Sequence, residues 1–252
     1  MRLLDALADL LLGGRCVGCA RPGRVLCGRC EALLPAGARP AWPSPVPPGL
    51  VTPWAAGPYD GVVRAMVVGH KERRLLALRD PLALLLARSA AAALAPVRGP
   101  VVLVPVPSRP ASVRARGYDP TYALTAGAAA RLAAAGRDVA VRRLLRTRPG
   151  VVDQAGLGAE ARAANLAGSM HCPSAVLRRL GERWPRASLV VCDDVLTTGA
   201  TAREAQRALE SVGLQVTAVA AVAATRRRWA PGGLAGHSES SVRRVSPSQN
   251  TH

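Results

Sequence analysis

Apolar residues follow two alternating patterns between about residue 51 and residue 225. Short runs rich in valine and leucine predict strands, and alanine- and leucine-rich runs with apolar positions three and four apart predict helices. The predicted strands are residues 51–56, 101–105, 139–145, 188–193 and 214–224. The predicted helices are residues 60–69, 79–95, 119–135 and 201–212. This alternation favours an α/β fold, in which helices flank a parallel sheet.

The remaining residues divide the chain into further parts. Residues 1–34 begin with leucines three and four apart, which predict an amphipathic helix, and continue into a segment with four cysteines. Residues 35–50 hold a run so rich in proline that it excludes a helix interior or a central strand and predicts a linker. Residues 51–225 form the main domain. Residues 226–252 lack apolar periodicity and predict a disordered basic tail.

Composition narrows the class of protein. The 252 residues are 49% hydrophobic, which is enough for a core, and their net charge of +18 predicts a surface that attracts phosphates, nucleic acid or acidic partners. The longest apolar stretch, Leu82–Val97, is interrupted by Arg88 and Pro96, so we expect no membrane span. Asp5 and Asp9 interrupt what would be the apolar region of a secretory signal, which predicts a cytoplasmic protein.

Four cysteines form two closely spaced pairs near the N-terminus. They are Cys16, Cys19, Cys27 and Cys30. A two-residue gap within each pair lets a turn direct both thiolates at one point, as a tetrahedral zinc site requires, and Gly18 and Gly28 are expected to supply backbone freedom. Four cysteine ligands make a closed, structural site. Two disulfides are the alternative, and the expected reducing compartment favours zinc.

The most informative segment is residues 188–201, a hydrophobic strand followed by two acids, a loop of small residues and a helix. Thr201 and Glu204 predict a capping box at the start of that helix. Free N–H groups, threonine hydroxyls and a helix N-terminus then meet in one place, which suits a phosphate monoester, and Gly199 leaves room for it. Asp193 and Asp194 would accept hydrogen bonds from a vicinal diol. The alternative is an ordinary strand, turn and helix with exposed acids.

This segment resembles the phosphoribosyl pyrophosphate motif of type I phosphoribosyltransferases, and residues 10–225 as a whole resemble the ComF family. The other matching residues are Tyr59, Gly61, Val63, Arg64, Lys71, Val104–Pro107 and Arg116-Gly117-Tyr118, with looser matches at Arg148, Gln154, Leu157, Arg162 and Asn165. Asp119 departs from the pattern, in which an amide is usual, and an insertion occupies about residues 171–187. The resemblance implies a type I phosphoribosyltransferase-like parallel sheet flanked by helices, with a small N-terminal zinc-binding head.

The resemblance also implies a set of site residues. Asp193 and Asp194 would be the catalytic acids, acting on ribose hydroxyls with Mg2+ bound to the substrate. The 5-phosphate would be bound by Val195, Thr197, Thr198, Gly199, Ala200 and Thr201. The pyrophosphate side would be formed by Lys71, the only lysine in the chain, with Ser108, Arg109, Arg114 and Arg116. Met66–Arg79 would form a hood over the acceptor. Arg146–Asn165 would be either a closing lid or a plain surface loop.

Two hypotheses of function follow. In the first, the protein binds phosphoribosyl pyrophosphate and transfers the phosphoribosyl group to an unidentified acceptor; the resemblance places it in DNA uptake during natural transformation. In the second, it is a non-catalytic accessory factor that binds single-stranded DNA beside other DNA-uptake proteins, through its basic surface. A P-loop or dinucleotide-binding enzyme is set aside, because neither glycine motif is present.

Overall fold

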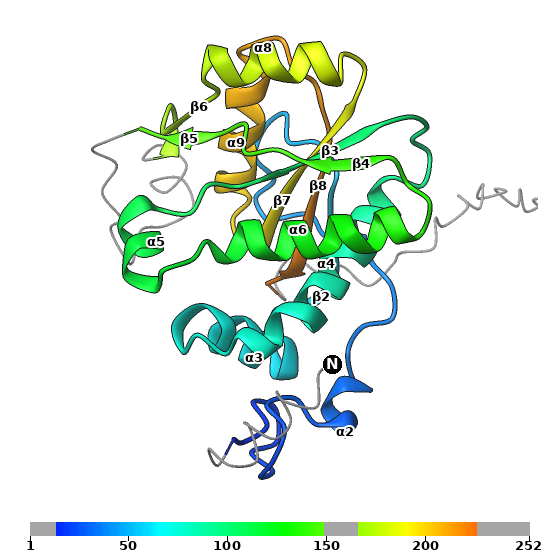
Figure 1. The fold of residues 1–252 in the computed structure, drawn as a ribbon, viewed down its shortest axis with the longest axis vertical. Coiled ribbons are helices and arrows are strands. Elements are labelled where there is room, and N and C mark those ends of the chain that lie inside the picture. Colours follow the sequence, from blue (N-terminus) through cyan, green and yellow to red (C-terminus); the bar gives the residue numbers. More distant parts are fainter. Residues whose placement is uncertain (1–13, 149–165, 226–252) are drawn as a thin grey trace, which may run out of the picture.

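A central six-stranded sheet organises the molecule (Figure 1), a computed structural model that describes residues 14–148 and 166–225. Its strands lie in the order β1-β2-β8-β7-β3-β4. Their bounds are β1 Arg39–Pro40, β2 Pro53–Pro58, β8 Val216–Ala224, β7 Ser188–Leu196, β3 Val101–Pro105 and β4 Val139–Val141. All neighbours pair in parallel except β1, which pairs antiparallel with β2. The expected α/β architecture with a mostly parallel sheet is therefore present.

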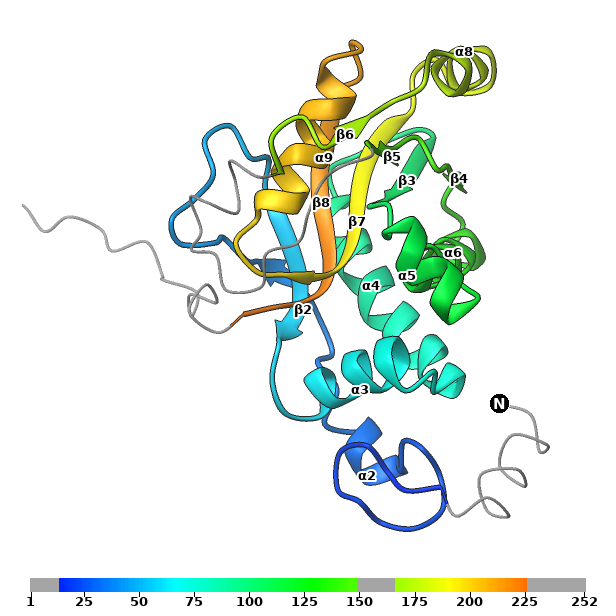
Figure 2. The same ribbon diagram turned by 90° about the vertical axis from the view of Figure 1, so that its left-hand side faces the viewer.

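Helices cover both faces of this sheet (Figure 2). One face carries α3 Gly61–Glu72, α4 Arg79–Ala93 and α6 Pro120–Ala134, and the other carries α9 Ala200–Glu210. Side chains of β8 alternate between the two cores, as the period of two requires: Ala220 and Val222 face the first, and Val219 and Ala221 face the second. Burial on both faces explains why β7 and β8 are almost continuously apolar.

All five predicted strands and all four predicted helices are present, β3 with the predicted bounds and the others with shifted ends, and further elements were not predicted. The strand expected at 139–145 ends at Val141, the last residue paired in register with β3, and the Arg142 N–H donates to the backbone oxygen of Leu103 at 3.1 Å. Apolar periodicity did not predict the short elements. These are α2 Gly28–Glu31, one 3-10 turn at Leu76–Leu78, α5 Pro110–Arg116, and the antiparallel pair β5 Arg146–Thr147 and β6 Met170–His171. The insertion contains a further helix, α8 Ser174–Arg183, whose mostly polar composition hid it.

The proline-rich segment packs against the main domain. Arg39 and Pro40 form the edge strand β1, which agrees with the exclusion of a central strand. Ala41 and Leu50 are buried in the core beside α9. Residues 35–50 therefore lie along the sheet and α9 rather than standing apart as a spacer.

The cysteine segment lies below α3 in Figures 1 and 2. Cys16, Leu26 and Cys30 share a buried cluster with Val63 and Met66 of α3. The helix expected near the N-terminus (residues 1–13) and the tail 226–252 fall outside the described residues. In the part of the chain that the structure describes, no helix combines the length and apolarity that crossing a membrane requires.

Candidate functional site

A cavity of about 380 Å³ lies between the carboxyl end of β7 and helix α3. Its lining comes from two parts of the chain far apart in sequence: Tyr59, Val67, Val68, Lys71 and Glu72 on one side, and Asp193, Asp194, Val195, Thr197 and Thr201 on the other. The fold therefore brings the predicted lysine to the predicted acids and to part of the predicted phosphate loop. Ligands of parallel α/β sheets bind at this end of the strands.

Lys71 and Asp194 form an ion pair in this cavity. The Asp194 side chain is 4% exposed and that of Lys71 is 34% exposed. Burial opposes the charge of the ammonium group, but the carboxylates of Asp194 and Asp193 outweigh burial and raise the pKa of Lys71. The only lysine of the chain is thus held as a cation, directed at the two acids.

Asp193, unlike Lys71, has surroundings that disfavour its charged form. Burial, followed by the negative charge of Asp194, raises its pKa from the usual 3.8 to about 7, although Lys71 acts in the other direction. One oxygen of Asp193 accepts a hydrogen bond from the N–H of Asp194 at 2.8 Å. The two acids and one lysine therefore carry an excess of negative charge, which a cation or hydroxyl donors would relieve.

The loop after β7 presents unpaired donors. Gly199 is the N-cap of α9 and has a φ of 73°, and a Cβ there would lie 2.9 Å from Pro43 Cγ, so the linker packs directly on this turn. The Ala200 N–H reaches the Thr198 hydroxyl at 3.3 Å. No described residue accepts a hydrogen bond from the N–H of Thr198, Gly199 or Thr201. Donors of this kind at the N-terminus of an 11-residue helix suit an anion.

The predicted capping box is wrong. Helix α9 begins at Ala200 with Gly199 as its N-cap, one residue earlier than expected, and no side chain caps it. Glu204 instead accepts hydrogen bonds from the Met170 N–H at 2.9 Å and from Arg207. Thr201 is therefore not part of a capping box, and it lines the cavity. The reason is tertiary: the strand β6 approaches α9 and offers Glu204 a backbone donor.

The Arg116-Gly117-Tyr118 turn supports the end of α3 that carries Lys71. The Tyr118 hydroxyl donates to the backbone oxygen of His70, and the two rings meet edge to face at 5.5 Å. A side-chain N–H of Arg74 donates to the backbone oxygen of Arg116. His70 is buried, and burial lowers its pKa to about 4, so it is neutral at ordinary pH. This motif therefore positions Lys71 indirectly, through the hydrogen bond to the backbone oxygen of the preceding residue, His70.

The four other residues predicted for the pyrophosphate side do not line the cavity. Ser108, Arg109, Arg114 and Arg116 lie on and around α5, which follows the neighbouring strand β3. The Val106 N–H donates to the Cys192 backbone oxygen at 2.9 Å, so this turn begins beside Asp193. Their role in binding pyrophosphate stays a prediction.

Asp119, which stands where an amide was expected, has two hydrogen-bond partners and one ion-pair partner in this region. It accepts the hydroxyl of Ser108 at 2.8 Å and the N–H of Tyr122 at 3.2 Å, and so caps α6. An amide oxygen can accept both of these bonds, so the departure preserves the turn. The carboxylate adds an ion pair with Arg143 at 3.7 Å.

Sequence reasoning omitted several lining residues. Glu72 and the valines Val67 and Val68 lie in the segment expected to form a hood. Helical spacing of three and four from Lys71 would have identified the two valines, whereas Glu72 directly follows Lys71 and this spacing does not indicate it. Tyr59 was matched as a motif residue without a role at the site. Of the expected lid, Arg146 and Thr147 form β5, and residues 149–165 lie outside the described part of the chain.

The four N-terminal cysteines lie close enough together to bind a zinc ion, since their sulfur atoms are all within 4.8 Å of one another. Tetrahedral zinc with bonds of about 2.3 Å requires sulfurs about 3.8 Å apart. Cys19 Sγ and Cys27 Sγ are 3.6 Å apart, so the set fits such an ion. Burial raises the pKa of Cys16, but N–H groups of Cys27, Cys19 and Gly18 outweigh it and lower the pKa to about 6, which favours the thiolate ligand.

The two glycines of this segment act differently from the expectation. Neither has a positive φ, whereas Ala20 and Gly23 between the two pairs do. Gly18 is small because a Cβ would lie 2.9 Å from Cys30 Sγ and 3.0 Å from Val62 of α3. Gly28 starts α2 and has open space around it. Cys192 is buried in β7, as predicted.

Comparison with known proteins adds no assignment. No family model matches this chain, and a search of curated proteins finds no match.

Proposed function

We propose that this chain is a ComF-like protein with a type I phosphoribosyltransferase domain, which binds phosphoribosyl pyrophosphate and transfers its phosphoribosyl group to an acceptor. The observation that carries the proposal is one cavity that is lined by Lys71, by the acid pair Asp193 and Asp194, and by two residues of the loop, Thr197 and Thr201. A cation, two hydrogen-bond acceptors and a phosphate-binding turn are what a phosphorylated sugar with an anionic leaving group requires.

Each group has a role in this proposal. The loop N–H groups and hydroxyls bind the 5-phosphate, and Asp193 and Asp194 accept hydrogen bonds from the ribose hydroxyls. Lys71 attracts the pyrophosphate, whose departure breaks the C1–O bond and leaves the electron pair on the leaving oxygen. The acceptor then forms its bond to C1. Stabilisation of the separated charges, rather than a strong base, lowers the barrier.

Mg2+ is part of the proposal as a partner of the substrate. The carboxylate oxygens of Asp193 and Asp194 are hard donors of the kind that Mg2+ prefers. Burial, and then the charge of Asp194, raises the pKa of Asp193, and a bound cation would favour the ionised form of this carboxyl group. The ion would supply electrostatic stabilisation of pyrophosphate. DNA uptake is the cellular setting that the resemblance adds.

Calorimetric titration tests the proposal. Phosphoribosyl pyrophosphate should bind the wild-type protein in the presence of Mg2+, and binding should weaken at least about 100-fold in Asp193→Asn with Asp194→Asn, because two charge-assisted contacts are lost. The control is Asp80→Asn with Asp138→Asn, which removes the same charge from two exposed positions outside the cavity. Retained binding in the first pair, or no Mg2+-dependent binding by the wild type, would refute the proposal.

A further inference from the structure

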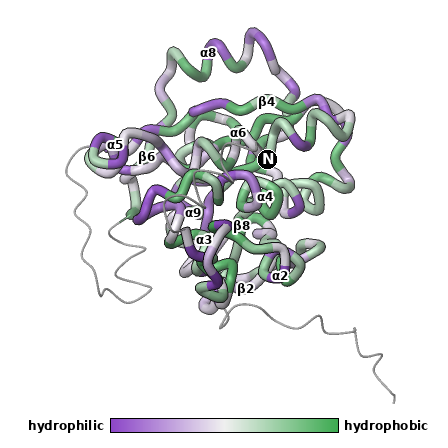
Figure 3. Tube along the Cα trace, turned by 60° about the horizontal axis from the view of Figure 1, so that its bottom comes forward, coloured by the Kyte–Doolittle hydropathy of each residue, from purple (hydrophilic) through white to green (hydrophobic). Residues whose placement is uncertain are grey.

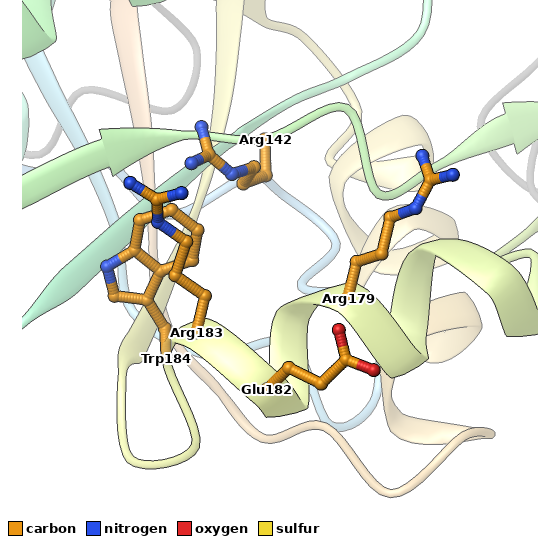
Figure 4. Close-up of a pocket in the computed structure, with 5 residues that line it drawn as sticks. All are labelled: Arg142, Arg179, Glu182, Arg183 and Trp184. Atoms are coloured by element: carbon orange, nitrogen blue, oxygen red, sulfur yellow. The ribbon is translucent and has the colours of Figure 1, made fainter.

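An arginine-lined groove lies between α8 and the residues that follow edge strand β4 (Figure 4). Helix α8 is at the opposite end of the fold from α3 (Figure 1). Two cavities, of about 570 and 290 Å³, share Arg142 and Arg179 and so form one elongated depression. Arg183 and Trp184 line its larger part, and Arg143 lines its smaller part. None of these residues lines the Asp193 cavity, so the groove is a separate feature.

Aromatic contacts hold two of the arginines, Arg142 and Arg183, in place. Arg142 lies over the indole of Trp184 at 4.0 Å, and Arg183 lies across it at 5.2 Å (Figure 4). No carboxylate of a described residue is within ion-pair distance of Arg142, Arg179 or Arg183. Stacking orients a guanidinium group without using up its charge. The groove therefore offers several positive charges that remain available to a ligand.

The walls and floor of the groove differ in polarity. Arginines project from both walls, and the hydrophilic stretches along α8 are visible in Figure 3. The apolar residues that line the smaller part, which we call its floor, are Leu144, Val176 and Leu180; Leu144 and Leu180 are buried and Val176 is partly exposed. A chain that alternates anionic phosphates with flat, apolar bases fits charged walls and an apolar floor. A run of carboxylates would leave the floor unused, and one phosphate ion would fill only a small part of the volume.

We propose that this groove binds single-stranded nucleic acid, with phosphates on Arg142, Arg179 and Arg183 and bases against the floor. Helix α8 supplies one wall, so the inserted segment at about 171–187 creates the site. The proposal goes beyond the phosphoribosyl pyrophosphate site, and each can fail independently of the other.

Fluorescence anisotropy of a labelled oligothymidine of about 20 nucleotides tests the groove, with an oligouridine of equal length as the RNA arm. Arg179→Gln with Arg183→Gln should weaken binding at least about 10-fold. The same pair should make the plot of log affinity against log salt shallower by about 1.4, the value expected for two lost phosphate contacts. The matched control is Arg178→Gln with Arg186→Gln, which removes equal charge from exposed positions outside the groove; it should change affinity less than about 2-fold.

Glu182, the one acid of the groove, gives a test of opposite sign: Glu182→Gln should strengthen binding. Equal losses in the two arginine pairs, or no binding of either oligonucleotide at about 50 mM salt, would overturn the proposal. So would competition by polyglutamate as strong as that by unlabelled oligonucleotide, which would indicate an acidic protein partner. Binding retained in Asp193→Asn would support a site separate from the acid pair.

Discussion

Asp193→Asn should stabilise the ligand-free protein at pH 8. Burial and the neighbouring Asp194 raise the pKa of Asp193 from 3.8 to about 7, so its ionised form is disfavoured in the folded state. A rise of this size corresponds to about 4 kcal/mol between the charged and neutral carboxyl. The asparagine carbonyl can still accept the 2.8 Å hydrogen bond from the Asp194 N–H, so the substitution removes the charge and keeps this contact.

The effect must depend on pH in one direction. Between about pH 4 and pH 7 the folded state holds a proton on Asp193 that the unfolded state has lost, so the stability of the wild type falls as pH rises through this window. Asparagine does not titrate, so the stability of Asp193→Asn does not fall for this reason as pH rises. The difference between variant and wild type should be small near pH 4 and reach its maximum above pH 7.

Thermal unfolding followed by circular dichroism, without Mg2+ or substrate, measures this difference. A gain of about 2–4 kcal/mol would raise the Tm of a chain of this size by roughly 5–15 °C at pH 8. Asp138→Asn is the control, since it removes an exposed carboxylate and should leave the Tm within about 2 °C of the wild type. If Asp193→Asn melts at or below the wild-type temperature at pH 8, burial does not disfavour this carboxylate and our account of the acid pair fails.

Three further predictions concern other parts of the site. Lys71→Met should lower the free energy of unfolding by about 2 kcal/mol, measured by urea denaturation, because the buried Asp194 loses its counter-charge; an unchanged midpoint would contradict this. Gly199→Ala should lower the Tm more than Gly213→Ala does: both have positive φ and cost about 1–2 kcal/mol, but only at Gly199 does the new Cβ meet a neighbour, Pro43. The purified protein should contain one zinc per chain by elemental analysis and lose it in Cys19→Ser, whereas two disulfides would give no zinc and four fewer free thiols.

Local sequence patterns were sufficient for the architecture. Strands buried on both faces need continuous apolar runs, and helices beside them need apolar positions three and four apart, so β3, β7, β8 and the long helices could be predicted. The spacing of the cysteine pairs likewise predicted a cluster that the structure bears out. Helix α8 was missed because only Leu180 among its residues is buried, and a helix with little buried surface leaves a weak apolar pattern.

Local sequence patterns did not predict the contacts between distant segments. Nothing in the order of residues shows that Lys71 pairs with Asp194 rather than Asp193, because that choice depends on how α3 lies over the end of β7. The spacing of Thr201 and Glu204 predicted a local capping box. In the fold, the Glu204 carboxylate instead accepts a hydrogen bond from the Met170 N–H of β6.

The sequence by itself therefore determined the long strands and helices, the parallel sheet, the cysteine cluster and the types of residue available for chemistry, since these depend on short-range periodicity and spacing. Tertiary structure alone decided which charges meet, which carboxyl holds its proton near neutral pH, and that Arg142 and Trp184 border a common groove. Electrostatic energies depend on burial and on distances across the chain, and only the folded arrangement sets those.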